Sequence, residues 1–255
     1  MKTKLSITKT ELEALVQKHS DPEIARMFNA CSSSVKNWRD KFGIKPLHRL
    51  KRAKTHRVNE AFFSEIDSEV KAYTLGFFAG DGNVHPRERS FSIGVSSVDQ
   101  DILYKIRSAM ESDIPIKIVS NSRGYNPDGK MAILDVSRMS MVKDLSRLGF
   151  HPRKTRNLHY PNLPKELDHH FIRGLLDADG SISDQNFFIC GDSALIYDSV
   201  KKIRQHTNHT LLFYEKGLHF RVWGLRRDKD VLRWLYDGST IFLDRKFFRY
   251  KDFWS

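Results

Sequence analysis

The chain has 255 residues, 40% hydrophobic and 29% charged, enough for one large domain or for one domain plus a small appendage with a real core. It contains no apolar run of about 18 residues, which excludes a membrane-spanning helix, and no signal peptide is expected at its start. Its only cysteines, Cys31 and Cys190, are far apart, which excludes a cysteine-built zinc site and fits a reducing compartment. The net charge of +12, of which residues 1–60 carry +8, favours a nucleic-acid partner.

Three short helices are predicted in the first 44 residues. Thr8 has capping-box spacing to Glu11 at the start of the first helix. Asp21 and Pro22 begin the second helix, and one of the serines at 32–34 caps the third.

Asn29 falls in the turn between the second and third helices, where left-handed backbone is expected. Residues 21–42 resemble a bacterial or phage helix-turn-helix, whose second helix, at about 32–41, would enter the major groove. The alternative is an ordinary three-helix bundle. We expect residues 1–44 to form a DNA-binding domain and residues 45–60 to form a basic linker that lies along phosphates.

The remainder of the chain contains an internal repeat. The segment "AYTLGFFAGDGNV" (72–84) aligns with "HFIRGLLDADGSI" (170–182) at an offset of 98 residues. Each copy is followed by two strand patterns, a helix pattern, two more strand patterns and a second helix pattern. We therefore predict an α+β fold with two α-β-β-α-β-β-α repeats, residues 61–160 and 161–255.

Small residues recur four apart in both copies: Gly76 and Gly80 in the first, Gly174 and Ala178 in the second. Residues at this spacing share one face of a helix. Each repeat therefore offers a helix with one bare face, and we expect these faces to pack together until the two backbones touch.

An aspartate follows each bare face, at the end of each predicted helix. Asp81 and Asp179 are followed by Gly82 and Gly180, which are expected to take the left-handed cap conformation. Two carboxylates beside two negative helix ends require a cation, and Mg²⁺ is the natural partner of oxygen ligands.

The two motifs resemble the signature of the LAGLIDADG homing endonucleases in their single-chain, two-motif form. "IRGLLDADG" (172–180) is a close match and "LGFFAGDG" (75–82) a looser one, and the resemblance covers residues 61–255. It implies a pseudo-twofold fold with the motif helices at its centre and saddle-shaped antiparallel sheets along the DNA major groove.

The resemblance also assigns roles to residues of the motifs. It implies that Asp81 and Asp179, each with the residue before it, Gly80 and Ala178, form the metal site. The earlier aspartate of the signature is present only in the second copy, as Asp177, so we interpret it as support for the helix.

A basic step follows the late helix of each repeat, in "PRKT" (152–155) and "DRKF" (244–247). Lys154 and Lys246 match the family's late basic position, near the lysine that helps to activate water. The resemblance therefore implies catalytic roles for both lysines, and the alternative is contact with phosphate only.

Residues expected to contact DNA lie on helix 32–41, in the basic linker, on the outward side of the strands and in the polar loop 120–130. Alternation places Phe91, Ile93 and Val95 against the helices and leaves the side chains between them for DNA. The same alternation is expected to turn five more apolar residues toward the helices: Leu218, Phe220 and Val222, and also Ile116 and Ile118 on either side of Lys117. The expected contacts are Ser33, Ser34, Lys36, Asn37, Arg39, Arg52, Lys54, Arg87, Arg89, Ser92, Ser96, Lys117, Arg123, Lys130, Gln185, His219 and Arg221.

The resemblance implies a site-specific endonuclease that uses Mg²⁺ to cut both DNA strands and leaves short 3′ overhangs. Mn²⁺ is expected to substitute, and Ca²⁺ to support binding without cleavage. We expect a cytoplasmic monomer, in a bacterial or phage-infected cell, acting on a long asymmetric target in double-stranded DNA. Two alternatives use the same scaffold: a DNA-binding regulator that does not cut, and an RNA maturase. The presence of both Asp81 and Asp179 argues against the regulator.

Overall fold

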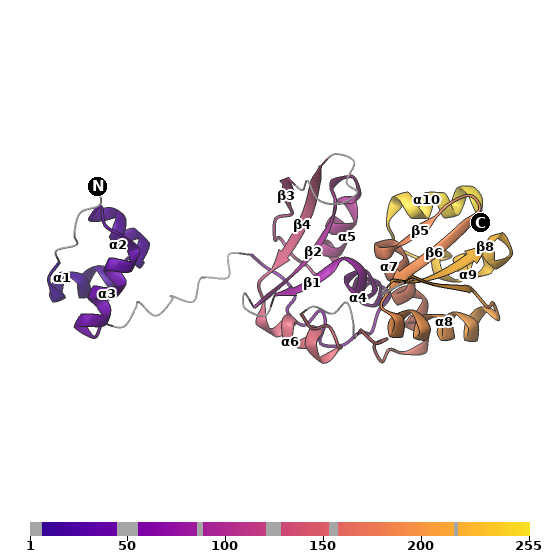
Figure 1. Ribbon diagram of the computed structural model, residues 1–255, viewed down its shortest axis with the longest axis horizontal. Helices are drawn as coiled ribbons and strands as arrows, with labels where there is room; N and C mark the ends of the chain where they lie inside the picture. Colours follow the sequence, from indigo (N-terminus) through magenta and orange to yellow (C-terminus); the bar gives the residue numbers. More distant parts are fainter. Residues whose placement is uncertain (1–6, 45–55, 86–88, 121–128, 153–157, 217–218) are drawn as a thin grey trace. The chain divides into compact units, whose positions relative to one another are not determined.

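The computed structural model describes residues 7–44, 56–85, 89–120, 129–152, 158–216 and 219–255. The chain divides into two compact units, Met1–Thr55 and His56–Ser255 (Figure 1). No helix within the described ranges is long and apolar enough to cross a membrane.

The first unit is a bundle of three helices, α1 (Lys9–Val16), α2 (Asp21–Met27) and α3 (Ser32–Phe42). Its core is built from apolar side chains of all three helices, among them Leu12, Ile24 and Val35. The predicted turn between α2 and α3 is confirmed, because Asn29 has a φ of 48°.

The helix starts of this unit agree with the predictions in part. The capping box of α1 is confirmed: the Glu11 carboxylate accepts from the backbone N–H of Thr8 at 2.9 Å, and Thr8 Oγ1 accepts from Glu11 N. The prediction of a serine cap on α3 is wrong, since Cys31 occupies the N-cap position and its side chain makes no capping hydrogen bond.

The second unit contains two repeats with the predicted order of elements (Figure 1). The first repeat comprises α4 (Glu69–Asp81), β1 (Gly82–His85), β2 (Ser90–Ser96), α5 (Asp101–Ala109), β3 (Lys117–Ser120), β4 (Lys130–Val136) and α6 (Met139–Arg147). The second comprises α7 (Asp168–Asp179), β5 (Gly180–Ile182), β6 (Asn186–Gly191), α8 (Ser193–Thr207), β7 (Leu212–Lys216), β8 (His219–Leu225) and α9 (Lys229–Tyr236). A further helix, α10 (Asp244–Phe253), follows in the second repeat.

Each repeat forms one four-stranded antiparallel sheet, ordered β1-β2-β4-β3 in the first and β5-β6-β8-β7 in the second. In Figure 1, α4 and α7 lie in the middle of the unit, between the two sheets. Phe91, Ile93 and Val95 of β2 are buried against the helices, as alternation predicts. We call the opposite side of each sheet its open face.

Helices α4 and α7 touch through their backbones. A Cβ atom added to Gly76 would lie 1.9 Å from the carbonyl oxygen of Phe171, and one added to Gly174 would lie 2.1 Å from that of Tyr73. Such distances are far inside van der Waals contact, so both positions require glycine. The prediction that the two bare helix faces meet is confirmed.

The expected reason for the glycines after the motif aspartates is wrong. Gly82 and Gly180 are extended, with φ of −88° and −124°, and they begin β1 and β5 rather than forming left-handed caps. A Cβ on Gly82 would lie 2.2 Å from the ring of Phe78, and one on Gly180 would lie 2.5 Å from the carbonyl oxygen of Phe188. Crowding, not positive φ, explains the glycine at each helix–strand junction.

Helix α10 fastens the second repeat to the first. The guanidinium of Arg245 donates to both carboxylate oxygens of Asp99 at 3.0 and 2.9 Å, and Lys105 of α5 pairs with Asp244. The two repeats are therefore joined by ion pairs as well as by the central helix pair.

Replacing Gly76 with alanine tests the backbone contact. At an exposed helix position this change stabilises a protein by up to about 1 kcal/mol. Here we expect the free energy of unfolding to fall by about 3 kcal/mol, because the new methyl group meets a fixed backbone carbonyl. Urea denaturation followed by circular dichroism measures the difference. Gly94→Ala is the control, since the Cβ there would meet the flexible Met131 side chain at 3.1 Å and its nearest backbone atom, the Ala132 oxygen, lies 4.0 Å away. Equal stability of Gly76→Ala and Gly94→Ala would contradict the close contact.

Candidate metal and nucleic-acid site

The two motif aspartates come to the same place. Asp81 ends α4 and Asp179 ends α7. A Cβ added to Gly80 would lie 2.5 Å from the Cβ of Ala178 and 3.0 Å from Oδ2 of Asp179. The carboxylate of Asp179 thus lies against the backbone of α4, one residue before Asp81. Asp179 is exposed and Asp81 is half-buried, so solvent reaches the pair.

This donor set fits a metal ion that is also held by a substrate. The described ranges contain no group of three or more His, Cys, Asp or Glu side chains able to hold a metal. Mg²⁺ is usually bound by one or two protein carboxylates, together with waters and substrate phosphates, whereas structural zinc sites need four protein ligands. The predicted residues Asp81, Asp179, Gly80 and Ala178 therefore suit Mg²⁺ shared with a phosphate.

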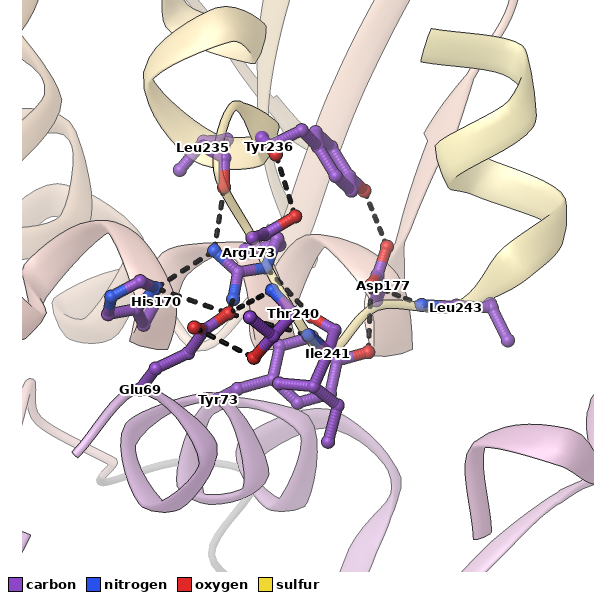
Figure 2. Close-up of polar contacts among 11 residues, drawn as sticks. Glu69, Tyr73, His170, Arg173, Asp177, Leu235, Tyr236, Thr240, Ile241 and Leu243 are labelled. Atoms are coloured by element: carbon purple, nitrogen blue, oxygen red, sulfur yellow. Dashed lines mark hydrogen bonds and ion pairs between the residues drawn. The ribbon is translucent and has the colours of Figure 1, made fainter. Parts of the chain in front are cut away.

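The other aspartate of the second motif has a structural role, as predicted. Asp177 is 1% exposed and accepts hydrogen bonds from the hydroxyl groups of Tyr73 (2.8 Å) and Tyr236, and from the backbone N–H of Leu243 (2.8 Å) (Figure 2). Burial raises the pKa of this carboxyl, and the nearby ammonium of Lys246 opposes the increase. Asp177 therefore joins α4, α7, α9 and the segment before α10.

A second polar cluster ties the start of α4 to α7. Arg173 is completely buried and donates to the Glu69 carboxylate at 2.7 Å and to the backbone carbonyls of Leu235 and Ile241 (Figure 2). Burial and the charge of Arg173 lower the pKa of His170 to about 4, so His170 is neutral in the folded protein. The sequence analysis missed this cluster, although the arginine in the apolar run "FIRGLL" was a signal for it.

Lys246 caps the end of α7. It lies in α10, its side chain is 2% exposed, and its Nζ donates to the carbonyls of Leu176 (2.8 Å), Asp177 (2.6 Å) and Gly180 (2.7 Å). Burial lowers its pKa to about 8, and the charge of Asp177 limits the decrease. All three N–H groups are used on the helix end, so the placement favours positioning over the expected activation of water. Lys154 lies outside the described residues.

The expected DNA-contacting residues of the first unit divide into two groups. Ser33, Lys36 and Asn37 are exposed on α3, and Ser34 is half-buried. Arg39 is buried, and its guanidinium binds the Asp21 carboxylate at 2.7 and 2.8 Å. Arg39 therefore holds α2 against α3, which corrects its expected place on the DNA-facing side.

The expected contacts of the second unit lie mostly at its surface. Ser92 and Ser96 are half-buried on the open face of β2, and Ile118 is 50% exposed although it was expected inside. The reason is that β3 is an edge strand, so Ile118 has a neighbouring strand on one side only. The exposed expected contacts are Arg89, Lys117, Lys130, Gln185 and Arg221. Arg52, Lys54, Arg87, Arg123, Leu218 and the side chain of His219 lie outside the described residues.

Comparison with known proteins gives matches to solved structures. No family model matches the sequence, and a search of curated proteins finds no match. The homing endonuclease I-WcaI, bound to its DNA recognition sequence, overlaps 82% of this chain and 96% of its own, with a TM-score of 0.51 and 10% identity. The chain therefore has the LAGLIDADG fold.

Two further structures with the LAGLIDADG fold overlap this chain less closely. The N-terminal LAGLIDADG domain of DUF199/WhiA covers 73% of this chain and 92% of its own at 16% identity, with a TM-score of 0.48. Mesophilic variants of the homing endonuclease I-DmoI cover 76% and 99% at 15% identity, with a TM-score of 0.49. Of the three overlaps only that with I-WcaI exceeds 0.5, and at 10% identity it bears on the fold alone.

Asparagine substitutions test whether the two carboxylates of the second motif, Asp177 and Asp179, differ in their contribution to stability. Asp177→Asn should lower the free energy of unfolding by roughly 3 kcal/mol, because at least one of its three buried donors loses an acceptor. Asp179→Asn should change it by less than about 0.5 kcal/mol, because the side chain is exposed at a negative helix end. Urea denaturation of both variants checks this. Equal losses would show that the two carboxylates do not differ in role.

Proposed function

We propose that the chain is a site-specific DNA endonuclease that depends on a divalent metal ion. The observation that carries the proposal is the meeting of Asp81 and Asp179 at the abutting ends of α4 and α7. The LAGLIDADG fold, the net charge of +12 and the DNA-bound structure of I-WcaI support it.

The residues at the site would have two roles in cleavage, metal binding and positioning. A bound metal ion would supply polarisation of the phosphate and a more acidic water molecule. Asp81 and Asp179 would hold such ions, and the contact between Gly80 and Ala178 sets the separation of the two helix ends. Lys246 holds the end of α7 by donating to three of its terminal carbonyls and thereby orients Asp179.

The open faces of the two sheets would bind the two halves of a long target. Because the halves are chemically different parts of one chain, the target is asymmetric and the chain acts as a monomer. Cleavage of both strands would leave short 3′ overhangs. We further propose that the protein works in the cytoplasm, on chromosomal or phage DNA.

Asp179→Asn and Asp81→Asn test the nuclease proposal. Duplexes that bind the full chain are first selected from a random pool in Ca²⁺ and are then incubated with protein in Mg²⁺ or Mn²⁺. Each variant should cut at least about 100-fold more slowly than the unchanged chain while it retains affinity in Ca²⁺, because the metal ligand is lost and the DNA surface is not. Gel analysis of end-labelled DNA measures both properties.

Asp198→Asn is the matched control, because it makes the same chemical change on helix α8, where Asp198 pairs with the exposed Lys201. It should cut normally. Selected duplexes that bind the unchanged chain but stay intact in both metals would instead favour a regulator that does not cut.

We also propose that the first unit binds DNA through α3. Ser33, Lys36 and Asn37 are exposed on this helix, and its opposite side, with Val35, is buried in the bundle. A helix that follows a tight left-handed turn and carries a cation and an amide suits the major groove.

Substitutions on α3 test this second proposal. Lys36→Ala combined with Asn37→Ala should weaken binding to a selected duplex about 10-fold and reduce the slope of log affinity against log salt by about 1. Lys9→Ala is the control for charge, because Lys9 is an exposed lysine on α1 that pairs with Glu13. Titrations at several salt concentrations measure both quantities. An equal effect of Lys9→Ala would indicate a diffuse charge effect instead of an α3 contact.

A further inference from the structure

The open faces of the two sheets carry different chemistry. Residues directly opposite each other in antiparallel strands share a face, so the register defines rows of neighbouring side chains. In the first sheet, one row of the open face consists of Asn83, Ser92 and Asp135 across β1, β2 and β4. This row offers amide, hydroxyl and carboxylate groups, which suit hydrogen bonds to base edges.

The equivalent row of the second sheet is apolar from its second member onward. It runs from Ser181 through Phe188 and Trp223 to Leu212 across β5, β6, β8 and β7. The rings of Phe188 and Trp223 have centroids 4.7 Å apart, and Leu212 is 50% exposed. The positions occupied by Ser92 and Asp135 in the first sheet are thus occupied here by two aromatic rings.

The surroundings of this row favour an anionic partner. None of the described side chains on the open face of the second sheet is acidic. Arg221, exposed on the neighbouring row, holds its guanidinium 5.1 Å from the centroid of the Phe188 ring, and Tyr214 beside it is 50% exposed. Among its described side chains this largely apolar face carries a cation, Arg221, and no anion, which fits a nucleic acid better than it fits a second copy of the same face.

The row also lies at a defined distance from the metal site. Gly180 pairs with Ile189, so the next residue of β6, Cys190, lies beside Asp179 and shares its row with Arg221. Rows on one face are two residues, or about 7 Å, apart along a strand. With a base-pair rise of about 3.4 Å, the apolar row reaches roughly two base pairs farther from the cleavage position than Arg221 does.

From these observations we infer that the second sheet reads thymine methyl groups, an inference that rests on the proposed endonuclease function. The C5-methyl of thymine is the apolar group that a base pair presents in the major groove. Phe188, Trp223 and Leu212 would contact such methyl groups and exclude water from them. The half-site bound by the second repeat is therefore selected by thymine, and the half-site bound by the first repeat by hydrogen bonding.

The test is selection of duplexes by the full chain in Ca²⁺, followed by replacement of each selected thymine with uracil, which lacks only the methyl group. One half of the selected site should be enriched in thymine, and each uracil there should weaken binding about fourfold, the value of one buried methyl group. Uracil opposite the polar row of Asn83, Ser92 and Asp135 in the other half should have no effect. Failure to enrich any duplex would contradict the proposed function, whereas enriched sites without this uracil effect would contradict the thymine inference alone.

Two variants connect the uracil effect to the row. Phe188→Ser introduces the residue that the first sheet has at the equivalent position, and Leu212→Ser changes a side chain that is 50% exposed at the edge of its sheet. Both should bind thymine and uracil duplexes equally well. Val119→Ser, at an exposed apolar position on the open face of the first sheet, is the control and should keep the full discrimination. An unchanged uracil effect in both row variants would overturn the inference, as would tighter binding to single-stranded DNA or RNA, or a dimer of the free chain that Phe188→Ser dissociates.

Discussion

The contact between the backbones of α4 and α7 is the constraint on which the second unit depends. It places two helices side by side without side chains between them, which is possible only because Gly76 and Gly174 each face a carbonyl of the other helix. The ends of the helices are thereby brought together, and with them Asp81 and Asp179. The same contact determines where β1 and β5 start, because each strand continues directly from its helix. The position of the candidate metal site and the starting points of β1 and β5 thus follow from the contact between α4 and α7.

That close approach has an electrostatic cost, which the surrounding residues reduce. The C-terminal ends of α4 and α7 carry the negative charge of the helix dipoles, and they lie next to the two carboxylates. Lys246 places its ammonium on three carbonyls at the end of α7. The buried Asp177 is held by three donors from elements that are distant in sequence, and Arg173 holds the start of α4 through Glu69. The carboxylates of Asp81 and Asp179 can therefore be kept in place for a cation while the buried Asp177 and Arg173 keep their hydrogen bonds.

The features that were predicted correctly from the sequence depend on residues only a few positions apart. The four-residue spacing of small residues predicted the helix contact, alternation predicted the buried side of β2, and the capping box of α1 is contained in four residues. The predictions that were wrong depend on partners far along the chain. Arg39 is bound by Asp21, and Ile118 is exposed because β3 lies at the edge of its sheet. The catalytic role of Lys246 stays a prediction, although its ammonium lies on a helix end almost seventy residues earlier in the chain. Gly82 and Gly180 were identified, but for a different reason, because crowding by Phe78 and by Phe188 cannot be read from a glycine alone.

The asymmetry of the central helices makes each repeat specific for the other. A symmetric dimer would form its helix pair from two identical repeats. Here Asp177 faces Tyr73, and Arg173 faces Glu69, whereas the first copy has Ala79 at the position of Asp177 and Leu75 at that of Arg173. Two second repeats brought together would bury two carboxylates and two guanidinium groups without Tyr73 or Glu69, and two first repeats would lack all of these links. The two halves are therefore not interchangeable at the central helix pair.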